Sequence, residues 1–222
     1  IRQFGFNTET FPLNTQLAIG GGTMAVTPMQ MASAYTVFAN GGYQVEPHLI
    51  KRVLDINDAE VFAPSRPIVC PKNICAESIP ASNIDRGEMP SEDSEIAIPK
   101  SSQAEAIKVA PRAIDNRNAY VMHKMLQDVI RKGTGLRARV LGRSDLAGKT
   151  GTTNNAADTW FNGYSPEIAT TVWVGFPDHQ PLGEREYGSN TPLPIWIDYM
   201  REALKGRPEI EPETQGNYHN EN

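Results

Sequence analysis

Cysteine is scarce in this chain, which has two in 222 residues. Cys70 and Cys75 enclose four residues, a spacing that fits neither C-x-x-C redox chemistry nor a zinc site with four protein ligands. The pair predicts a disulfide that closes a small loop, as suits an oxidising compartment, and two free thiols are the alternative. We expect no metal and no cofactor.

Long hydrophobic runs and excess positive charge are absent as well. The longest apolar stretch, from Ile168 to Phe176, falls well short of the roughly 18 residues that a membrane-crossing helix needs. The formal net charge is -5, with an isoelectric point near 5.4. Nucleic-acid binders usually show a clustered basic surface, so we expect no nucleic-acid partner. Arg137, Arg139 and Arg143 are interpreted as solvated surface or, alternatively, as attraction for an anionic substrate.

Two common enzyme signatures are missing. The chain has no G-x-S-x-G segment, and none of its four histidines lies in a motif, so a Ser-His-Asp triad is not predicted. Gly148-Lys149-Thr150 resembles the end of a phosphate-binding P-loop. However, five residues instead of four separate it from Gly142, and the residues after Thr152 are a poor helix start. A nucleotide site is therefore disfavoured.

The most informative segment present is 147–154, Ala-Gly-Lys-Thr-Gly-Thr-Thr-Asn, which we place on a strand. Gly151 has no Cβ, so another backbone could lie close to it. Lys149 and the hydroxyls of Thr150 and Thr152 could hold an anion. Together these features predict a site for a peptide that ends in a carboxylate. By itself, the motif is equally compatible with a glycine turn beside a solvated lysine.

Further motifs surround this segment, both upstream and downstream of it. With it, they resemble the transpeptidase domain of the class A, bifunctional penicillin-binding proteins. They are Phe4-Gly5-Phe6, Gly20-Gly21-Gly22, residues 27–32, Lys132-Gly133-Thr134-Gly135, residues 158–164 and 172–176, and Pro194-Ile195-Trp196. The resemblance implies an α+β fold of the serine β-lactamase/penicillin-binding transpeptidase type, with an antiparallel sheet flanked by helices. It fails mainly in residues 63–112 and in the tail.

Two of the three catalytic elements of that family are missing from this chain. No serine is followed by lysine three residues later, as in S-x-x-K, or by asparagine two residues later, as in S-x-N. We therefore expect residues 1–207 to be the C-terminal part of a split or truncated domain, incomplete without an upstream half that carries both motifs. Residues 63–112 are expected to be a loop-rich insertion, either a disordered excursion or a partner-binding lid. Residues 208–222 are expected to be a disordered tail.

The resemblance also assigns roles to residues. In the complete enzyme a serine attacks a peptidoglycan stem peptide, forms an acyl-enzyme and is equally acylated by β-lactams. Lys149 would supply charge and order the S-x-N serine, and the Thr152 N–H would be an oxyanion donor. The substrate-binding residues would be Thr150, Gly151, Thr152, Thr153 and Asn154. There is no nucleophile in this chain. Asp158 is expected either to line the groove or to serve in a turn.

The family context implies more about the parent protein. It would also be a glycosyltransferase, anchored in the cytoplasmic membrane and working on its outer, periplasmic face. Two alternatives remain at this point: a β-lactamase or β-lactam sensor, because K-T-G occurs across the superfamily, and a non-catalytic interaction module.

Local patterns predict the main elements. Thr27, Pro28 and Gln30 form a capping box that begins a helix ending near Asn40. Other expected elements are a hairpin of residues 43–54 and 60–62, strands 159–164 and 168–176, and a last helix with Trp196, Tyr199, Met200, Ala203 and Leu204. A helix from Asp115 to Lys132 is expected to bury Met122, Met125, Leu126, Val129 and Ile130.

Overall fold

The computed structural model describes residues 1–9, 11–20, 24–64, 67–69 and 108–211. The chain divides into two compact units, one of residues 1–49 and 111–222 and the other of residues 50–110. Cys70, Cys75 and most of the expected insertion lie outside the described residues. No helix in the described ranges is both long enough and apolar enough to cross a membrane.

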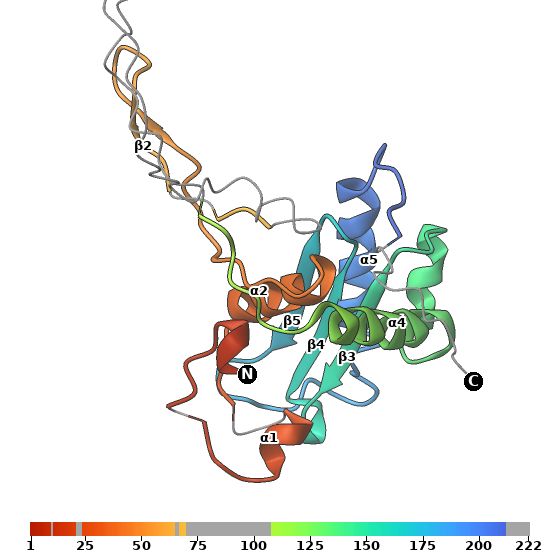
Figure 1. Ribbon diagram of the computed structural model, residues 1–222. Helices are drawn as coiled ribbons and strands as arrows, with labels where there is room; N and C mark the ends of the chain where they lie inside the picture. The colour runs from red at the N-terminus through yellow and green to blue at the C-terminus, as the bar shows by residue number, and fades with distance from the viewer. Residues whose placement is uncertain (10, 21–23, 65–66, 70–107, 212–222) are drawn as a thin grey trace, which may run out of the picture. The chain divides into compact units, whose positions relative to one another are not determined.

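The larger unit is built on a three-stranded antiparallel sheet in the order β3-β4-β5 (Figure 1). Its strands are β3 (Ala147–Thr152), β4 (Asp158–Tyr164) and β5 (Ala169–Gly175). Within the described sheet, β3 is an edge strand that pairs with β4 only. In its register Lys149 lies opposite Asn162 and Gly151 lies opposite Trp160. The three strands agree with the sequence prediction, with ends that differ by one or two residues.

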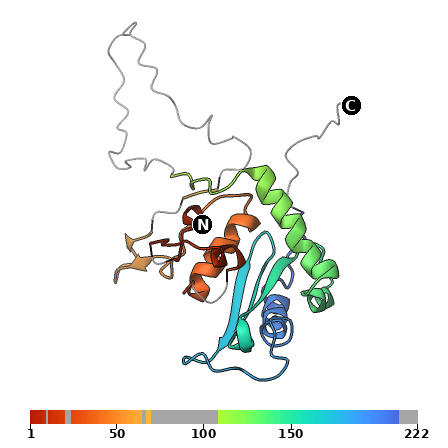
Figure 2. The same cartoon turned by 90° about the horizontal axis from the view of Figure 1, so that it is seen from below.

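Helices cover both faces of this sheet (Figures 1 and 2). Helix α2 (Pro28–Ala39) has the predicted capping box, since Thr27 accepts from the Gln30 amide and the Gln30 side chain accepts from the Thr27 amide. Helix α4 (Asn116–Lys132) begins at the Asp115 cap. The short elements are η1 (Arg2–Phe4), α1 (Gln16–Ile19), η2 (Leu136–Leu141) and η3 (Asn154–Ala156).

Helix α5 (Pro192–Ala203) packs on the face opposite α2. It begins four residues before Trp196, where the expected apolar stripe started, because a proline is well tolerated in the first helical turn. Trp196 is fully buried against Phe161, with ring centroids 4.9 Å apart. A Cβ on Gly163 would lie 2.7 Å from the Trp196 ring, so a glycine is required for this packing. This core holds the sheet face that α5 covers.

The buried face of α4 differs from the one predicted. Its buried residues are Ala119, His123, Leu126, Gln127 and Ile130, whereas Met125 is 58% exposed. Each of the two polar residues has one polar partner: His123 Nδ1 lies 3.2 Å from Tyr164 Oη, and Gln127 Nε2 donates to Ser144 O at 3.1 Å. Their other polar atoms, His123 Nε2 and Gln127 Oε1, have no partner among the described residues. An apolar pattern could not reveal that polar residues would occupy this face.

Residues 207–211 form a strap held by the segment before β3. Arg143 pairs with the buried Asp145 through two hydrogen bonds of 2.9 and 2.6 Å, and it also donates to the carbonyls of Arg207 and Pro208. The Glu209 carboxylate accepts from the Ser144 hydroxyl at 2.7 Å, which lowers the pKa of Glu209. Arg143 is thus neither solvated surface nor a substrate-attracting charge. Residues 208–211, expected in a disordered tail, are bonded, and 212–222 lie outside the described residues.

The second unit contains the predicted hairpin in a shorter form. Strand β1 (Val53–Leu54) pairs antiparallel with β2 (Glu60–Phe62). The Asp55 carboxylate accepts from the amides of Asn57 and Ala59 and so closes the turn. Of the expected extended segment, residues 53 and 54 pair in this hairpin, whereas Tyr43 forms an isolated antiparallel bridge with Arg112. Every residue of both strands is exposed.

Candidate active site

Strand β3 carries the Lys-Thr-Gly-Thr segment along the edge of the sheet, as predicted. Opposed residues of an antiparallel pair share a face, so Lys149 and Gly151 lie on the face that also presents Asn162 and Trp160. Lys149 is exposed, and its ammonium donates to the carbonyl of Thr150 at 2.8 Å. Asn162 is buried, and its Oδ1 accepts from the Thr171 hydroxyl at 2.8 Å. The Lys149 side chain therefore shares a face with the Asn162 amide, which the bond from Thr171 holds in place.

The two predicted hydroxyl groups lie on the opposite face of the same strand. Thr150 and Thr152 alternate with Lys149 along β3, so their side chains point away from the lysine face. Thr150 Oγ1 is 2.7 Å from Thr134 Oγ1, which brings the Lys132–Gly135 motif to the strand. Thr152 Oγ1 accepts a hydrogen bond of 3.0 Å from the Gly188 amide. A ligand can meet both the lysine and the hydroxyls only at the open edge of β3.

Gly151 was expected to allow another backbone to lie close. Its missing Cβ would stand 3.2 Å from the Trp160 Cβ, a tight contact on the lysine face. On the other side, the chain's own backbone approaches, because a Cβ on Gly188 would lie 2.6 Å from the Gly151 carbonyl oxygen. The close approach is therefore present within this chain and involves a loop that the sequence analysis did not single out.

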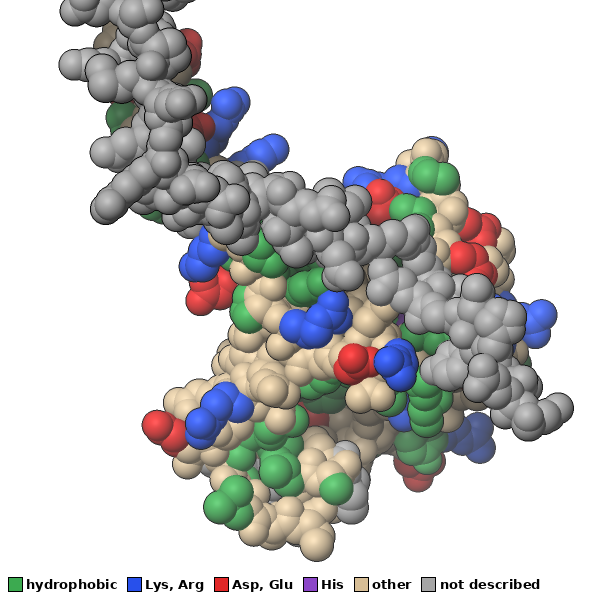
Figure 3. Space-filling view, viewed as in Figure 1, with side chains coloured by type: hydrophobic (Ala, Val, Ile, Leu, Met, Phe, Trp, Pro, Cys, Tyr) green, Lys and Arg blue, Asp and Glu red, His purple; other side chains and the backbone are tan. Residues whose placement is uncertain are grey.

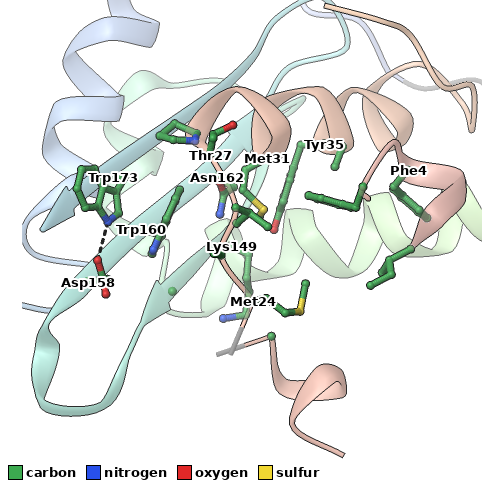
Figure 4. A pocket seen from close by; sticks show the side chains of 18 of the residues that line it. Phe4, Met24, Thr27, Met31, Tyr35, Lys149, Asp158, Trp160, Asn162 and Trp173 are labelled. Carbon is green, nitrogen blue, oxygen red and sulfur yellow. Dashed lines mark hydrogen bonds between the residues drawn. The ribbon is translucent and has the colours of Figure 1, made fainter. Parts of the chain in front are cut away.

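The connection from β3 to β4 is a closed turn. The Thr153 amide donates to the Asp158 carbonyl at 2.9 Å, and Thr153 Oγ1 accepts from the Asp158 amide at 2.8 Å. The Asp158 carboxylate accepts from Trp173 Nε1 at 2.9 Å and lies 3.2 Å from His179 Nδ1 (Figure 4). Asn154 is exposed at the start of η3. Asp158 combines the two expected roles, since it closes the turn and also lines the hollow described next.

A hollow of about 810 Å³ opens on the lysine face of the sheet. Its polar end includes Lys149, Thr150, Gly151, Thr153 and Asp158, whereas Thr152 and Asn154 do not line it. The opposite wall is apolar and comes from the N-terminal segment and α2 (Figure 4). It includes Phe4, Phe6, Leu17, Met24, Val26, Met31, Ala34, Tyr35 and Phe38. Figure 3 shows further hydrophobic side chains gathered over the segment around α1.

The apolar stripe of α2 belongs partly to the core and partly to the hollow. It does contribute to a cluster with Tyr164, but Met31, Tyr35 and Phe38 also form a wall of the hollow. Burial raises the pKa of Tyr35 to about 12, so its phenol stays protonated at neutral pH. The sequence carried one signal for this apolar wall, because the apolar stripe extends over three turns of a helix. It could not say which part would be covered.

Other reactive groups are few around this hollow. None of its described lining residues is a serine or a cysteine. In the described parts of the chain, no group of three or more His, Cys, Asp or Glu side chains could hold a metal ion. His123 is buried, and this burial lowers its pKa to about 4, whereas His179 lies at the rim beside Asp158.

Comparisons with known proteins show which family this chain resembles. Residues 3–195 match the penicillin-binding protein transpeptidase domain. Penicillin-binding protein 1A of Pseudomonas aeruginosa is 46% identical over 221 residues, which cover 94% of this chain and 26% of that protein. The protein of the same name from Neisseria lactamica is 40% identical, over 94% of this chain and 21% of its own length.

A solved structure is similar as well. The 2.6 Å crystal structure of penicillin-binding protein 1A from Haemophilus influenzae matches with a TM-score of 0.76 and 32% identity, over 96% of this chain and 31% of that one. This likeness confirms the predicted fold class. The chain spans about a quarter of the length of the curated relatives it matches. The chain thus belongs to the penicillin-binding protein transpeptidase domain family, as its resemblance to the class A members predicted.

Proposed function

We propose that this chain is the C-terminal part of a peptidoglycan D,D-transpeptidase that works through an acyl-serine and is acylated by β-lactams. The observation that carries the proposal is the edge strand β3, which carries Lys149 on one face and the hydroxyls of Thr150 and Thr152 on the other. Membership of the transpeptidase family agrees with it. The cation and the hydroxyl donors suit a ligand with a terminal carboxylate.

We assign the proposed roles to residues of β3. The exposed Lys149 ammonium donates to the Thr150 backbone carbonyl, and in this proposal it also meets an incoming serine of S-x-N. The hydroxyls of Thr150 and Thr152 donate to the ligand carboxylate. The Thr152 N–H, on the edge strand, acts as one donor to the oxyanion that forms when the serine attacks. Gly151, Thr153 and Asn154 complete the proposed substrate-binding set.

The reaction itself needs groups from an upstream half. Its serine attacks the penultimate D-alanyl carbonyl and forms an ester, while the hydroxyl proton passes to the S-x-x-K lysine. The terminal D-alanine leaves as an amine that takes up this proton. An amine of a second stem then attacks the ester and releases the serine. Nucleophile and base both come from outside this chain, so we propose that the isolated chain is inactive.

The hollow supports a docking role for that upstream half. Its apolar wall on α2 and the N-terminal segment faces the lysine side of β3, and none of the described residues that line it is a serine or a cysteine. An apolar segment seated there would bring its own polar groups to Lys149. For the whole protein we further propose a glycosyltransferase part, a membrane anchor and a location on the outer, periplasmic face of the cytoplasmic membrane. The greater length of the relatives leaves room for the first two.

Labelling with a penicillin tests the proposal. The chain is fused to the preceding half of the domain from the 46% identical relative, chosen so that the added half contains S-x-x-K and S-x-N. Intact mass should increase by one penicillin for the fusion and should not change for the chain by itself. The matched control replaces the nucleophilic serine of the added half with alanine. An adduct on a serine of the isolated chain, or an unlabelled but folded fusion, contradicts the proposal. Rapid release of the adduct would instead favour a β-lactamase.

A further inference from the structure

The loop of residues 183–191, which we call the 183–191 loop, lies against the end of β3. Its Gly188 amide donates to Thr152 Oγ1 at 3.0 Å, across 36 residues of sequence. A Cβ on Gly188 would stand 2.6 Å from the Gly151 carbonyl oxygen and 2.7 Å from that of Trp160. Both neighbours are backbone atoms in paired strands, which cannot move aside as a flexible side chain can. Only glycine fits at this position without displacing the loop.

Several bonds hold the 183–191 loop in this place. Arg137 of η2 donates to the Ser189 carbonyl at 3.3 Å, and Asn190 Nδ2 donates to the Arg185 carbonyl at 2.8 Å. The Thr191 hydroxyl bonds the Glu186 carboxylate, and the Asn190 amide donates to the Tyr187 carbonyl. The Gly188 amide is therefore presented to β3 by a loop that is tied both to itself and to η2.

The chemical consequence lies at the Thr152 hydroxyl. A threonine hydroxyl has one hydrogen to donate and two lone pairs that accept. The Gly188 amide occupies one lone pair, so the hydroxyl hydrogen points away from the loop. A carboxylate can only accept hydrogen bonds and requires this orientation. We propose that Gly188 is a positioning residue that orients the Thr152 hydroxyl as a donor, and that the 183–191 loop thereby sets the preference of the site for ligands with a carboxylate.

This inference rests on the proposed function, and its test compares ratios within the fusion enzyme described above. Acylation rates are measured on benzylpenicillin and on its methyl ester, which lacks the charged carboxylate. Gly188→Ala should lower the ratio of the two rates about threefold to tenfold, as expected for one misaligned hydrogen bond. Ser189→Ala is the matched control, because Ser189 contacts Arg137 through its backbone carbonyl and its hydroxyl makes an exposed bond of 3.4 Å to Asn190. Its ratio should equal the parental one.

Two further variants separate positioning from general damage. In a Thr152→Val background, Gly188→Ala should cause no additional fall in the ratio. If Gly188→Ala does not fold, Arg137→Gln takes its place as the test, because this change adds no atoms at the strand. Arg137→Gln should also lower the ratio of the two acylation rates. Amide exchange in the full chain gives an independent readout, since Thr152→Val should speed exchange of the Gly188 amide.

The outcomes are distinct. A parental fusion that is not acylated overturns the proposed function and this inference together. With an acylated parent, the inference alone fails in three cases: if the variants lower both rates equally, if the effects of Gly188→Ala and Thr152→Val on the ratio add, or if Thr152→Val leaves exchange of the Gly188 amide unchanged.

Discussion

At the scale of single residues, the position of Lys149 makes a sharp prediction. Its ammonium is exposed at the hollow and bonds the Thr150 carbonyl at 2.8 Å. In the fusion enzyme, Lys149→Ala should lower the β-lactam acylation rate at least about tenfold, since loss of a charged hydrogen bond of roughly 1.5–3 kcal/mol changes a rate by that order. Lys205→Ala, at an exposed lysine after α5, is the matched charge control. Acylation at the parental rate would make the strand purely structural.

The Thr152 side chain gives a second prediction at this scale. Thr152→Val removes the hydroxyl but keeps the backbone N–H that we propose as an oxyanion donor. Acylation by benzylpenicillin should therefore fall several-fold, by the order of one hydrogen bond to a charged group, while acylation by its methyl ester should change little. Stopped-flow rates on both compounds provide the measurement. An equal loss on both would mean that the hydroxyl has no part in recognising the carboxylate.

At the scale of elements, a buried histidine of α4 should make the free energy of unfolding depend on pH. Burial, helped by the nearby Lys124 charge, lowers the pKa of His123 from 6.5 to about 4, and its Nε2 has no partner among the described residues. The unfolded chain therefore binds a proton at higher pH than the folded one. The free energy of unfolding should fall as pH drops from about 6.5 to about 4, by up to about 1.4 kcal/mol per pH unit.

Denaturant titrations of the full chain across that pH range measure how the free energy of unfolding changes with pH. The variant His123→Gln should lose the corresponding part of the slope, whereas His48→Gln, at an exposed histidine, should keep it. An unchanged slope in His123→Gln would show that His123 does not titrate differently in the two states.

The strap of residues 207–211 is a second element with a measurable contribution. Asp145 is 1% exposed, and Arg143 neutralises it through two hydrogen bonds. Arg143→Met should lower the free energy of unfolding by about 3–5 kcal/mol, because it leaves a buried carboxylate unpaired. The double variant Arg143→Met/Asp145→Leu should recover much of that loss. Arg201→Met, which removes the exposed pair of Arg201 with Asp198, is the control. If Arg143→Met lowers the free energy of unfolding no more than Arg201→Met does, the pair of Arg143 with Asp145 is not effectively buried.

At the scale of the whole molecule, the apolar wall of the hollow should matter for assembly. Met31 of α2 lines the hollow, whereas Met29 of the same helix is exposed and does not. When the upstream half is supplied as a separate chain, Met31→Glu should weaken its binding at least tenfold, and Met29→Glu should leave it unchanged. Titration calorimetry measures the affinity. Equal affinities for both variants would place the docking surface elsewhere.

Much of this organisation was predictable from local patterns. The capping box of α2, the Asp115 cap of α4 and the three strands each depend on residues within a few positions of one another. The Lys-Thr-Gly-Thr strand was found in the same way, and strand alternation then fixes which side chains share a face. The roles of Lys149 and Thr152 remain proposals.

What only the tertiary structure decided involves partners far apart in the sequence. The buried face of α4 depends on Tyr164 and Ser144, and the fate of Arg143 depends on residues 207 and 208. The hydroxyl of Thr152 acquires its partner from Gly188. Burial of a polar group costs least where a complementary group meets it, and such meetings are set by how the helices pack on the sheet. The sequence by itself determined the family, the elements and the candidate strand, whereas packing decided how that strand is equipped.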